Sequence, residues 1–81
     1  MSALTQAHLD QAQNHGIEFA LEEISKGYTS PGVVPIMVYT VAVNAGLKPH
    51  DLGFWRDAEE TYDAWETGYY STWSVQLSEH A

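Results

Sequence analysis

Residues 41–69 read VAVNAGLKPHDLGFWRDAEETYDAWETGY and hold the densest charge and most of the aromatic surface of the chain. After Pro49 the apolar residues recur at spacings of three and four, which is the period of one face of an α-helix. This face consists of Leu52, Trp55, Ala58, Tyr62, Trp65 and Tyr69. The pattern predicts a helix from Pro49 to Thr67, with the proline at its first position and the aromatic face buried.

The spacing between Val41 and Trp55 resembles a helix-turn-helix unit, in which a small residue lies where two helices cross and a glycine forms the turn. Ala42 takes the small position, and Gly46 takes the turn four residues later. The apolar positions around them are Val41, Ala45, Leu47, Leu52 and Trp55. This spacing predicts a helix from Pro35 to Ala45 that turns at Gly46 into the aromatic helix.

The charge of the aromatic helix is unlike that of a DNA-reading helix, which needs Arg, Lys, Asn or Gln to meet bases and phosphates. Arg56 is the only Lys or Arg among residues 51–69, where the acids are Asp51, Asp57, Glu59, Glu60, Asp63 and Glu66. Glu59, Asp63 and Glu66 share one face, on which like charges repel by about 0.2–0.5 kcal/mol per pair. The sequence therefore predicts an anionic ridge, formed by these three residues, beside the buried aromatic face.

A second long helix is predicted from Thr5 to Lys26, because apolar and small residues recur there at steps of three and four. They are Leu9, Ala12, Gly16, Ala20 and Ile24. Ser2 or Thr5 can cap its start, and Gly27 suits the C′ position after its end. A glycine in a helix interior costs about 1 kcal/mol relative to alanine. Because Gly16 lies on the apolar face, it favours a close crossing with another helix over a bend.

Two segments are ambiguous between helix and strand. Val33–Val43 is rich in β-branched residues, but Pro35 near its start suits a first helical turn. Trp73–Leu77 alternates apolar and polar residues, which is typical of a strand, in a tail that otherwise forms an extended segment or a short helix. We predict one all-α domain over residues 1–81, a compact bundle of three main helices plus a short C-terminal element. The alternative is an α+β domain with Val33–Val43 and Trp73–Leu77 as strands.

Eleven acids and three Lys or Arg residues give this chain of 81 residues a net charge of −8. Long-range repulsion disfavours direct binding to nucleic acid or to an anionic membrane surface, and a cationic partner is the natural complement. The alternative is that the charge only keeps a small protein soluble. Without cysteine there is neither a disulfide nor a thiolate metal site, and the N-terminus has no basic n-region or apolar h-region. We expect a soluble protein of the reducing cytoplasm.

The chain offers little material for catalysis. His15, Glu18 and Glu22 share one helical face and are suitable metal ligands, but a carboxylate site in a helical bundle needs a second motif from other helices, and none is present. No serine stands in a nucleophile elbow, and the glycines form no phosphate-binding loop with a lysine. We therefore expect no enzymatic activity, no metal site and no cofactor.

In its size, its charge and its lack of catalytic motifs, the chain resembles the small acidic inhibitor proteins encoded by phages, including anti-CRISPR proteins and other DNA mimics. This resemblance implies stoichiometric binding to a basic, nucleic-acid-binding host protein, with aromatic residues as anchors of the interface. The predicted partner-binding residues are Asp57, Glu59, Glu60, Asp63, Glu66, Tyr69, Tyr70 and Trp73. The alternatives are a regulator or adaptor derived from the helix-turn-helix unit, and a structural subunit that forms a homodimer or larger oligomer through its Trp and Tyr surface.

Overall fold

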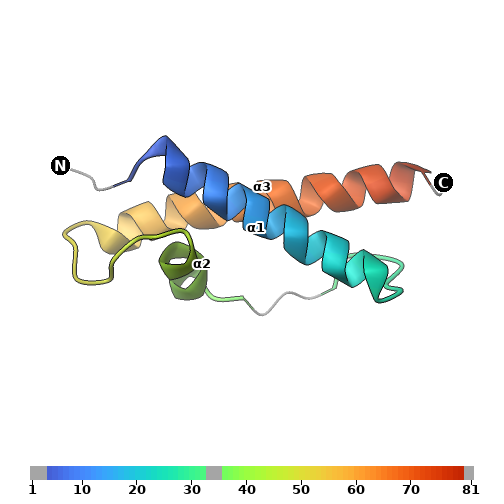
Figure 1. Cartoon of the computed structure of the whole chain (residues 1–81), viewed down its shortest axis with the longest axis horizontal. Helices are drawn as coiled ribbons and strands as arrows, with labels where there is room; N and C mark the ends of the chain where they lie inside the picture. Colours follow the sequence, from blue (N-terminus) through green and yellow to red (C-terminus); the bar gives the residue numbers. More distant parts are fainter. Residues whose placement is uncertain (1–3, 33–35, 80–81) are drawn as a thin grey trace.

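The computed structural model describes residues 4–32 and 36–79, which form three α-helices and no strand. Helix α1 spans Gln6–Ser25, α2 spans Val38–Asn44 and α3 spans Phe54–Glu79. Helices α1 and α3 run in the same direction and cross, and the short α2 packs mainly against α3 (Figure 1). The predicted all-α fold is confirmed. The molecule is elongated, measuring 45 × 21 × 15 Å along its principal axes.

Two glycines allow α1 and α3 to approach closely. A Cβ atom at Gly16 would clash with the backbone carbonyl of Trp65, and a Cβ atom at Gly68 would clash with a backbone carbonyl of α1. The alanines one turn on either side of Gly16, Ala12 and Ala20, are fully buried. Small residues therefore bring the two backbones together, and the role predicted for Gly16 is confirmed.

Helix α3 continues through Gly68, so the predicted helix end at Thr67 and the separate C-terminal element are both wrong. The alternative of a strand at Trp73–Leu77 is also wrong, because this segment is helical. A glycine inside a helix costs about 1 kcal/mol, and the close crossing at Gly68 offsets this cost. Beyond the glycine, Tyr69 and Trp73 lie one turn apart and are both buried. Their burial keeps the tail helical.

Helix α3 begins at Phe54 and not at the predicted Pro49. The residues between them form turns, in which the Phe54 amide donates to the Asp51 carbonyl at 3.2 Å. As a consequence, Leu52 and Trp55, which were predicted to be buried, are 89% and 62% exposed. Phe54 takes the buried position in their place.

The helix-turn-helix prediction holds for the first helix and fails for the connection. Gly46 has a φ of 104° and ends α2 as its C′ residue, and the Leu47 amide donates to the Ala42 carbonyl at 3.0 Å. The apolar residues buried here as predicted are Val41, Ala42, Ala45 and Leu47. Residues 45–53 then connect α2 to α3, which is longer than the three- or four-residue turn of the motif. The chain therefore does not form the motif's geometry.

The remaining boundaries agree closely with the sequence. The Thr5 side chain accepts from the His8 amide, and His8 Nδ1 accepts from the Thr5 amide at 3.0 Å, so Thr5 caps α1. Gly27 has a φ of 94° and follows the end of α1 as predicted. Residues 38–43 are helical, which makes the strand alternative wrong there. Helix α2 begins at Val38, so the predicted start at Pro35 is too early, because Ile36 and the extended Met37 lie before the helix. Ser2 and residues 33–35 lie outside the described residues.

The buried hydrophobic side chains form two clusters. The larger one joins all three helices around Trp65 and contains Ala12, Ala20, Val41, Ala45, Trp65, Tyr69 and Trp73. The smaller one lies between α2 and the start of α3 and contains Ala42, Leu47, Phe54 and Ala58. Among the described residues, no helix combines the length and the apolar character that a membrane crossing requires.

Candidate protein-binding surface on α3

The eight predicted partner-binding residues divide into a buried set and a surface set. Asp57, Tyr69 and Trp73 are 3%, 0% and 1% exposed, so a partner cannot contact them while the protein is folded. The residues that remain accessible are Glu59, Glu60, Asp63 and Tyr70, which are exposed, and Glu66, which is partly buried. All of these accessible residues lie on α3, and they carry most of its negative charge.

The buried Tyr69 and Trp73 connect α3 to α1 through a single carboxylate. The Tyr69 hydroxyl donates to Glu23 Oε1, and Trp73 Nε1 donates to the same oxygen at 3.1 Å. Burial raises the pKa of the Tyr69 phenol to about 12, and the hydrogen bond and charge of Glu23 add to this effect. These two aromatic residues therefore hold the fold together. Glu23 had no predicted role, and no signal in the sequence identifies it.

Asp57 lies in the first turn of α3, where a carboxylate interacts favourably with the positive end of the helix dipole. Its Oδ1 atom lies 3.8 Å from Nε of the exposed Arg56 side chain. Asp57 is thus a buried residue that stabilises the start of the helix. It is therefore removed from the set of residues that a partner can reach.

A stripe of alternating aromatic and acidic residues follows the exposed side of α3. Its members are Trp55, Glu59, Tyr62, Glu66 and Tyr70, at steps of four, three, four and four residues. Those steps keep them on one side of a helix over about 22 Å, at 1.5 Å per residue. Asp63 is exposed one turn from Glu59 and widens the stripe. We call these six residues the acidic–aromatic stripe, and the three acids within it are the predicted anionic ridge.

The electrostatic environment of Tyr62 supports this arrangement. Burial raises the pKa of the Tyr62 phenol, and the charge of Glu66 and the proximity of Tyr70 raise it further. The Tyr62 ring stacks on the buried Trp65 at 6.2 Å between centroids, and the Tyr70 ring packs edge-on against Tyr69 at 4.9 Å. The Tyr62 and Tyr70 rings are thus held by the core, and the acidic residues alternate with them along the helix.

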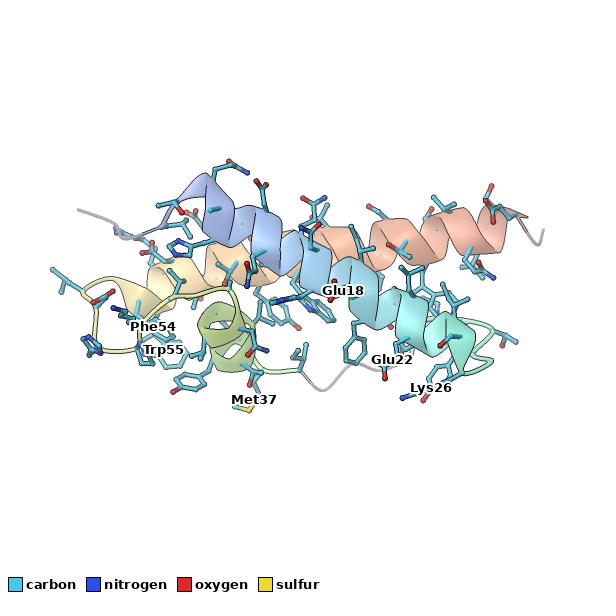
Figure 2. All side chains as sticks on the ribbon, viewed as in Figure 1. Glu18, Glu22, Lys26, Met37, Phe54 and Trp55 are labelled. Atoms are coloured by element: carbon cyan, nitrogen blue, oxygen red, sulfur yellow. The ribbon has the colours of Figure 1, made fainter. Side chains whose placement is uncertain are left out.

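The stripe begins beside a second exposed aromatic residue that sequence reasoning missed. Tyr39 of α2 packs against Trp55 at 6.1 Å between ring centroids and against the buried Phe54 at 5.9 Å. Met37, at the start of α2, is 67% exposed and projects outward near the same end of the molecule (Figure 2). The accessible surface therefore extends from α3 onto α2. The hydrophobic pattern did not reveal it, because Trp55 was assigned to the core.

The possible metal ligands of α1 do come together in space. His15, Glu18 and Glu22 line one pocket, but no group of three His, Asp or Glu side chains within the described ranges is arranged to hold a metal ion. Glu22 instead forms an exposed ion pair with Lys26, at 3.2 Å. The two glutamates therefore give this pocket negative charge. The chain matches no protein-family model, no curated protein and no solved structure.

Proposed function

We propose that this protein is a stoichiometric inhibitor that occupies the nucleic-acid-binding groove of a basic host protein, in the manner of anti-CRISPR proteins and other DNA mimics. The acidic–aromatic stripe is its contact surface. The observation that carries the proposal is the placement of acidic side chains along one exposed side of a helix that is held rigidly by an aromatic core.

The spacing of the charges suits a surface that normally binds phosphates. Glu59 and Glu66 are separated by about 10 Å along the helix axis, at 1.5 Å per residue, so the ridge presents three negative charges over a short length, as a run of phosphates does. Asp63 lies between them. A partner that binds phosphates presents Lys and Arg side chains at such separations. A net charge of −8 adds long-range attraction, which accelerates association at low ionic strength.

The aromatic residues of the stripe provide what charge alone does not. Trp55 and Tyr70 are 62% and 52% exposed, and Trp and Tyr are enriched among the residues that dominate binding energy at protein interfaces. Exposed acids by themselves mainly affect the association rate. The combination predicts fast, salt-sensitive association through the acids and slow dissociation through the aromatic anchors.

The test is a pull-down from bacterial lysate at low and high salt with three forms of the protein. The ridge variant, Glu59→Lys/Asp63→Lys, changes two exposed acids of the stripe, and the control variant, Asp10→Lys/Glu79→Lys, makes the same change in net charge at exposed positions away from it. The proposal requires a basic nucleic-acid-binding protein that the wild type and the control capture at low salt and the ridge variant does not. Added DNA or RNA should displace it. Equal capture by both variants would reject the stripe as the contact surface.

Self-association is the second candidate function, because the exposed Tyr39 and Trp55 pack together and Met37 and Leu52 near them in the sequence are also exposed. Two copies that cover this surface would form a homodimer. Gel filtration with light scattering measures the mass directly. A dimer that becomes a monomer in the Trp55→Ser variant supports this function, and a monomer at every concentration rejects it.

A further inference from the structure

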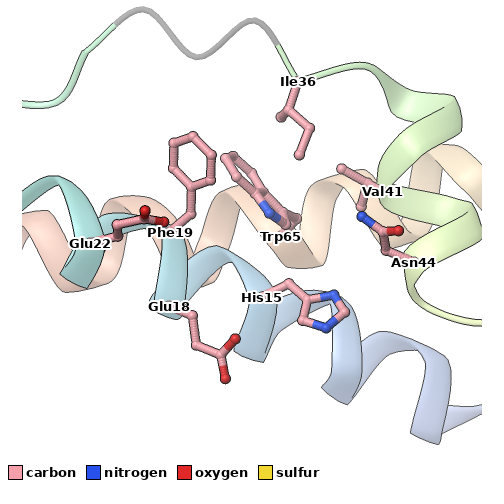
Figure 3. A pocket seen from close by; sticks show the side chains of 8 residues that line it. All are labelled: His15, Glu18, Phe19, Glu22, Ile36, Val41, Asn44 and Trp65. Atoms are coloured by element: carbon pink, nitrogen blue, oxygen red, sulfur yellow. The ribbon is translucent and has the colours of Figure 1, made fainter.

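A pocket of about 210 Å³ opens between α1 and α2. Helix α1 contributes one wall, α2 and Ile36, two residues before it, contribute the opposite side, and Trp65 of α3 lies at the centre (Figure 3). The lining residues are His15, Glu18, Phe19, Glu22, Ile36, Val41, Asn44 and Trp65. The pocket belongs to a part of the surface that the stripe does not include.

The inner part of the pocket is apolar and preformed. Trp65 stacks on Tyr69 at 5.1 Å between centroids and meets Phe19 edge-on at 5.6 Å. Val41 is 1% exposed, and Ile36 packs against the same core cluster. Because the core holds these side chains in place, an occupant does not have to organise them, which lowers the entropic cost of binding.

The outer part of the pocket is negatively charged. Glu18 and Glu22 lie one turn apart on α1, which places their Cβ atoms about 5–6 Å from each other. Glu18 is exposed, and Glu22 is paired with Lys26 at 3.2 Å, with both of those side chains 62% exposed. An exposed pair of this kind is weak, so a cation from a partner can replace Lys26. The exposed Asn44 of α2 provides a further polar group at the rim.

Size and polarity together select the occupant. The pocket is smaller than the about 300–1,000 Å³ that is usual for drug-sized ligands and cofactors, so it fits one side chain. An apolar interior with two glutamates among its lining residues suits an aliphatic stem that ends in a cation. Arginine fits better than lysine, because its planar guanidinium offers five donors in a fixed fork that meets several acceptors at once.

We propose that this pocket receives one arginine side chain of the basic partner, with the stem against the partly exposed Phe19 and Ile36 and the guanidinium between Glu18 and Glu22. The proposal deepens the proposed function and rests on it for the identity of the partner. It assigns the protein a second contact site, and the partner must then bridge the α1–α2 side and the stripe.

The first experiment uses a small probe and needs no partner. Nα-acetyl-arginine methylamide is titrated into the isotopically labelled protein, and NMR follows the Trp65 indole signal and the Ile36 and Val41 methyl signals. The matched control probe is the citrulline analogue, which has nearly the same shape and no charge. Saturable shifts at these three residues with the arginine probe in the millimolar range, and none with the citrulline probe, are expected. Equal shifts with both probes, or no saturable shift with either, would overturn the proposal.

Variants identify the groups that bind the probe. Glu18→Gln/Glu22→Gln removes both charges from exposed positions and should weaken the arginine probe about tenfold, since one exposed ion pair contributes up to about fivefold. Asn44→Phe should abolish binding by filling the pocket. Glu59→Gln/Asp63→Asn removes two charges from the stripe and should leave probe affinity within about twofold. Full probe affinity in the Glu18→Gln/Glu22→Gln variant would contradict the assignment.

The two proposals fail in different ways. If the partner binds the wild type and the Glu18→Gln/Glu22→Gln variant equally but does not bind the ridge variant, the stripe remains the contact surface and the arginine pocket is rejected. If the arginine probe binds as expected but no basic partner depends on the stripe, the proposed inhibitor function is rejected. The pocket then remains an arginine site on a protein of another function.

Discussion

The Gly16→Ala substitution gives the sharpest test of the fold. Alanine has a higher helix propensity than glycine by about 1 kcal/mol, so an exposed glycine in the same helix would be stabilised by this change. At Gly16 the new methyl group instead meets the backbone carbonyl of Trp65. No side-chain rotation can relieve a clash with backbone, so α1 and α3 must separate. The wider spacing then loosens the contacts of Ala12 and Ala20 with α3.

The magnitude follows from two opposing terms. Overpacking of a core by added methylene groups costs about 1–3 kcal/mol, and a backbone clash belongs at the upper end of that range. Subtracting the propensity gain leaves a net loss of about 2 kcal/mol in the free energy of unfolding. For a domain of this size, 1 kcal/mol corresponds to about 4–8 °C in Tm, so Gly16→Ala should melt roughly 8–16 °C below wild type. That loss is large beside the about 4–12 kcal/mol expected for the whole chain.

The assay is thermal and urea unfolding followed by far-UV circular dichroism. Ser74→Ala is the matched control, because Ser74 is exposed to solvent and lies within α3 away from its ends. This substitution should change stability by no more than about 0.5 kcal/mol. Gly68→Ala should behave like Gly16→Ala, and the double variant should lose less than the sum, since one separation of the helices relieves both clashes. A Gly16→Ala variant as stable as wild type would refute the close crossing.

Three further predictions concern the stripe, the core and the start of α3. Changing all three ridge acids, Glu59, Asp63 and Glu66, to lysine should leave the melting temperature within a few degrees and abolish partner binding. The loss of binding should be largest at low salt, because at physiological ionic strength charges are screened over about 8 Å. Calorimetric titration at two salt concentrations checks this. Tyr69→Phe should lose about 1–3 kcal/mol of stability by removing the donor to a part-buried carboxylate. Because the folded pKa of Tyr69 is raised to about 12 from its usual value of 10.0, its phenol contributes stability that is complete below pH 10 and is lost as pH rises towards 12. Tyr69→Phe should reduce this alkaline decline in urea titrations. Leu52→Ser should leave unfolding unchanged within about 0.5 kcal/mol, since the side chain is 89% exposed, whereas a loss of several kcal/mol would restore the buried assignment.

The sequence predicted best those features that a single residue type determines. Gly27 and Gly46 end helices because their positive φ is strained for other residues. Gly16 was identified as a crossing point because it stood on an apolar face, where a glycine needs a packing reason. Its counterpart Gly68 was interpreted as a helix end, because a glycine late in a helical pattern has the same composition signal in both roles. Only the neighbouring helix distinguishes them.

The residue that begins α3, and with it the face of its first turn that is buried, was harder to predict. The errors at Trp55 and Asp57 follow from this. Leu52 and Trp55 fit the spacing of three and four residues as well as Phe54 does, so periodicity alone did not show which residue begins the helix. The turns before Phe54 select it, and the first turn of α3 rotates accordingly. Trp55 then moves from the core to the surface, and Asp57 moves from the surface to the core.

The same reasoning explains why the acidic residues retained their predicted place while two aromatic anchors did not. Solvation keeps most carboxylates at the surface whatever the register, so Glu59, Asp63 and Glu66 remain accessible or partly accessible. An aromatic residue is buried where a neighbouring element can cover its ring. The continuation of α3 past Gly68 places Tyr69 and Trp73 beneath α1, where the Glu23 carboxylate accepts from both. The aromatic anchors of the surface are therefore the rings that α1 does not cover, and in this molecule they alternate with acids along α3.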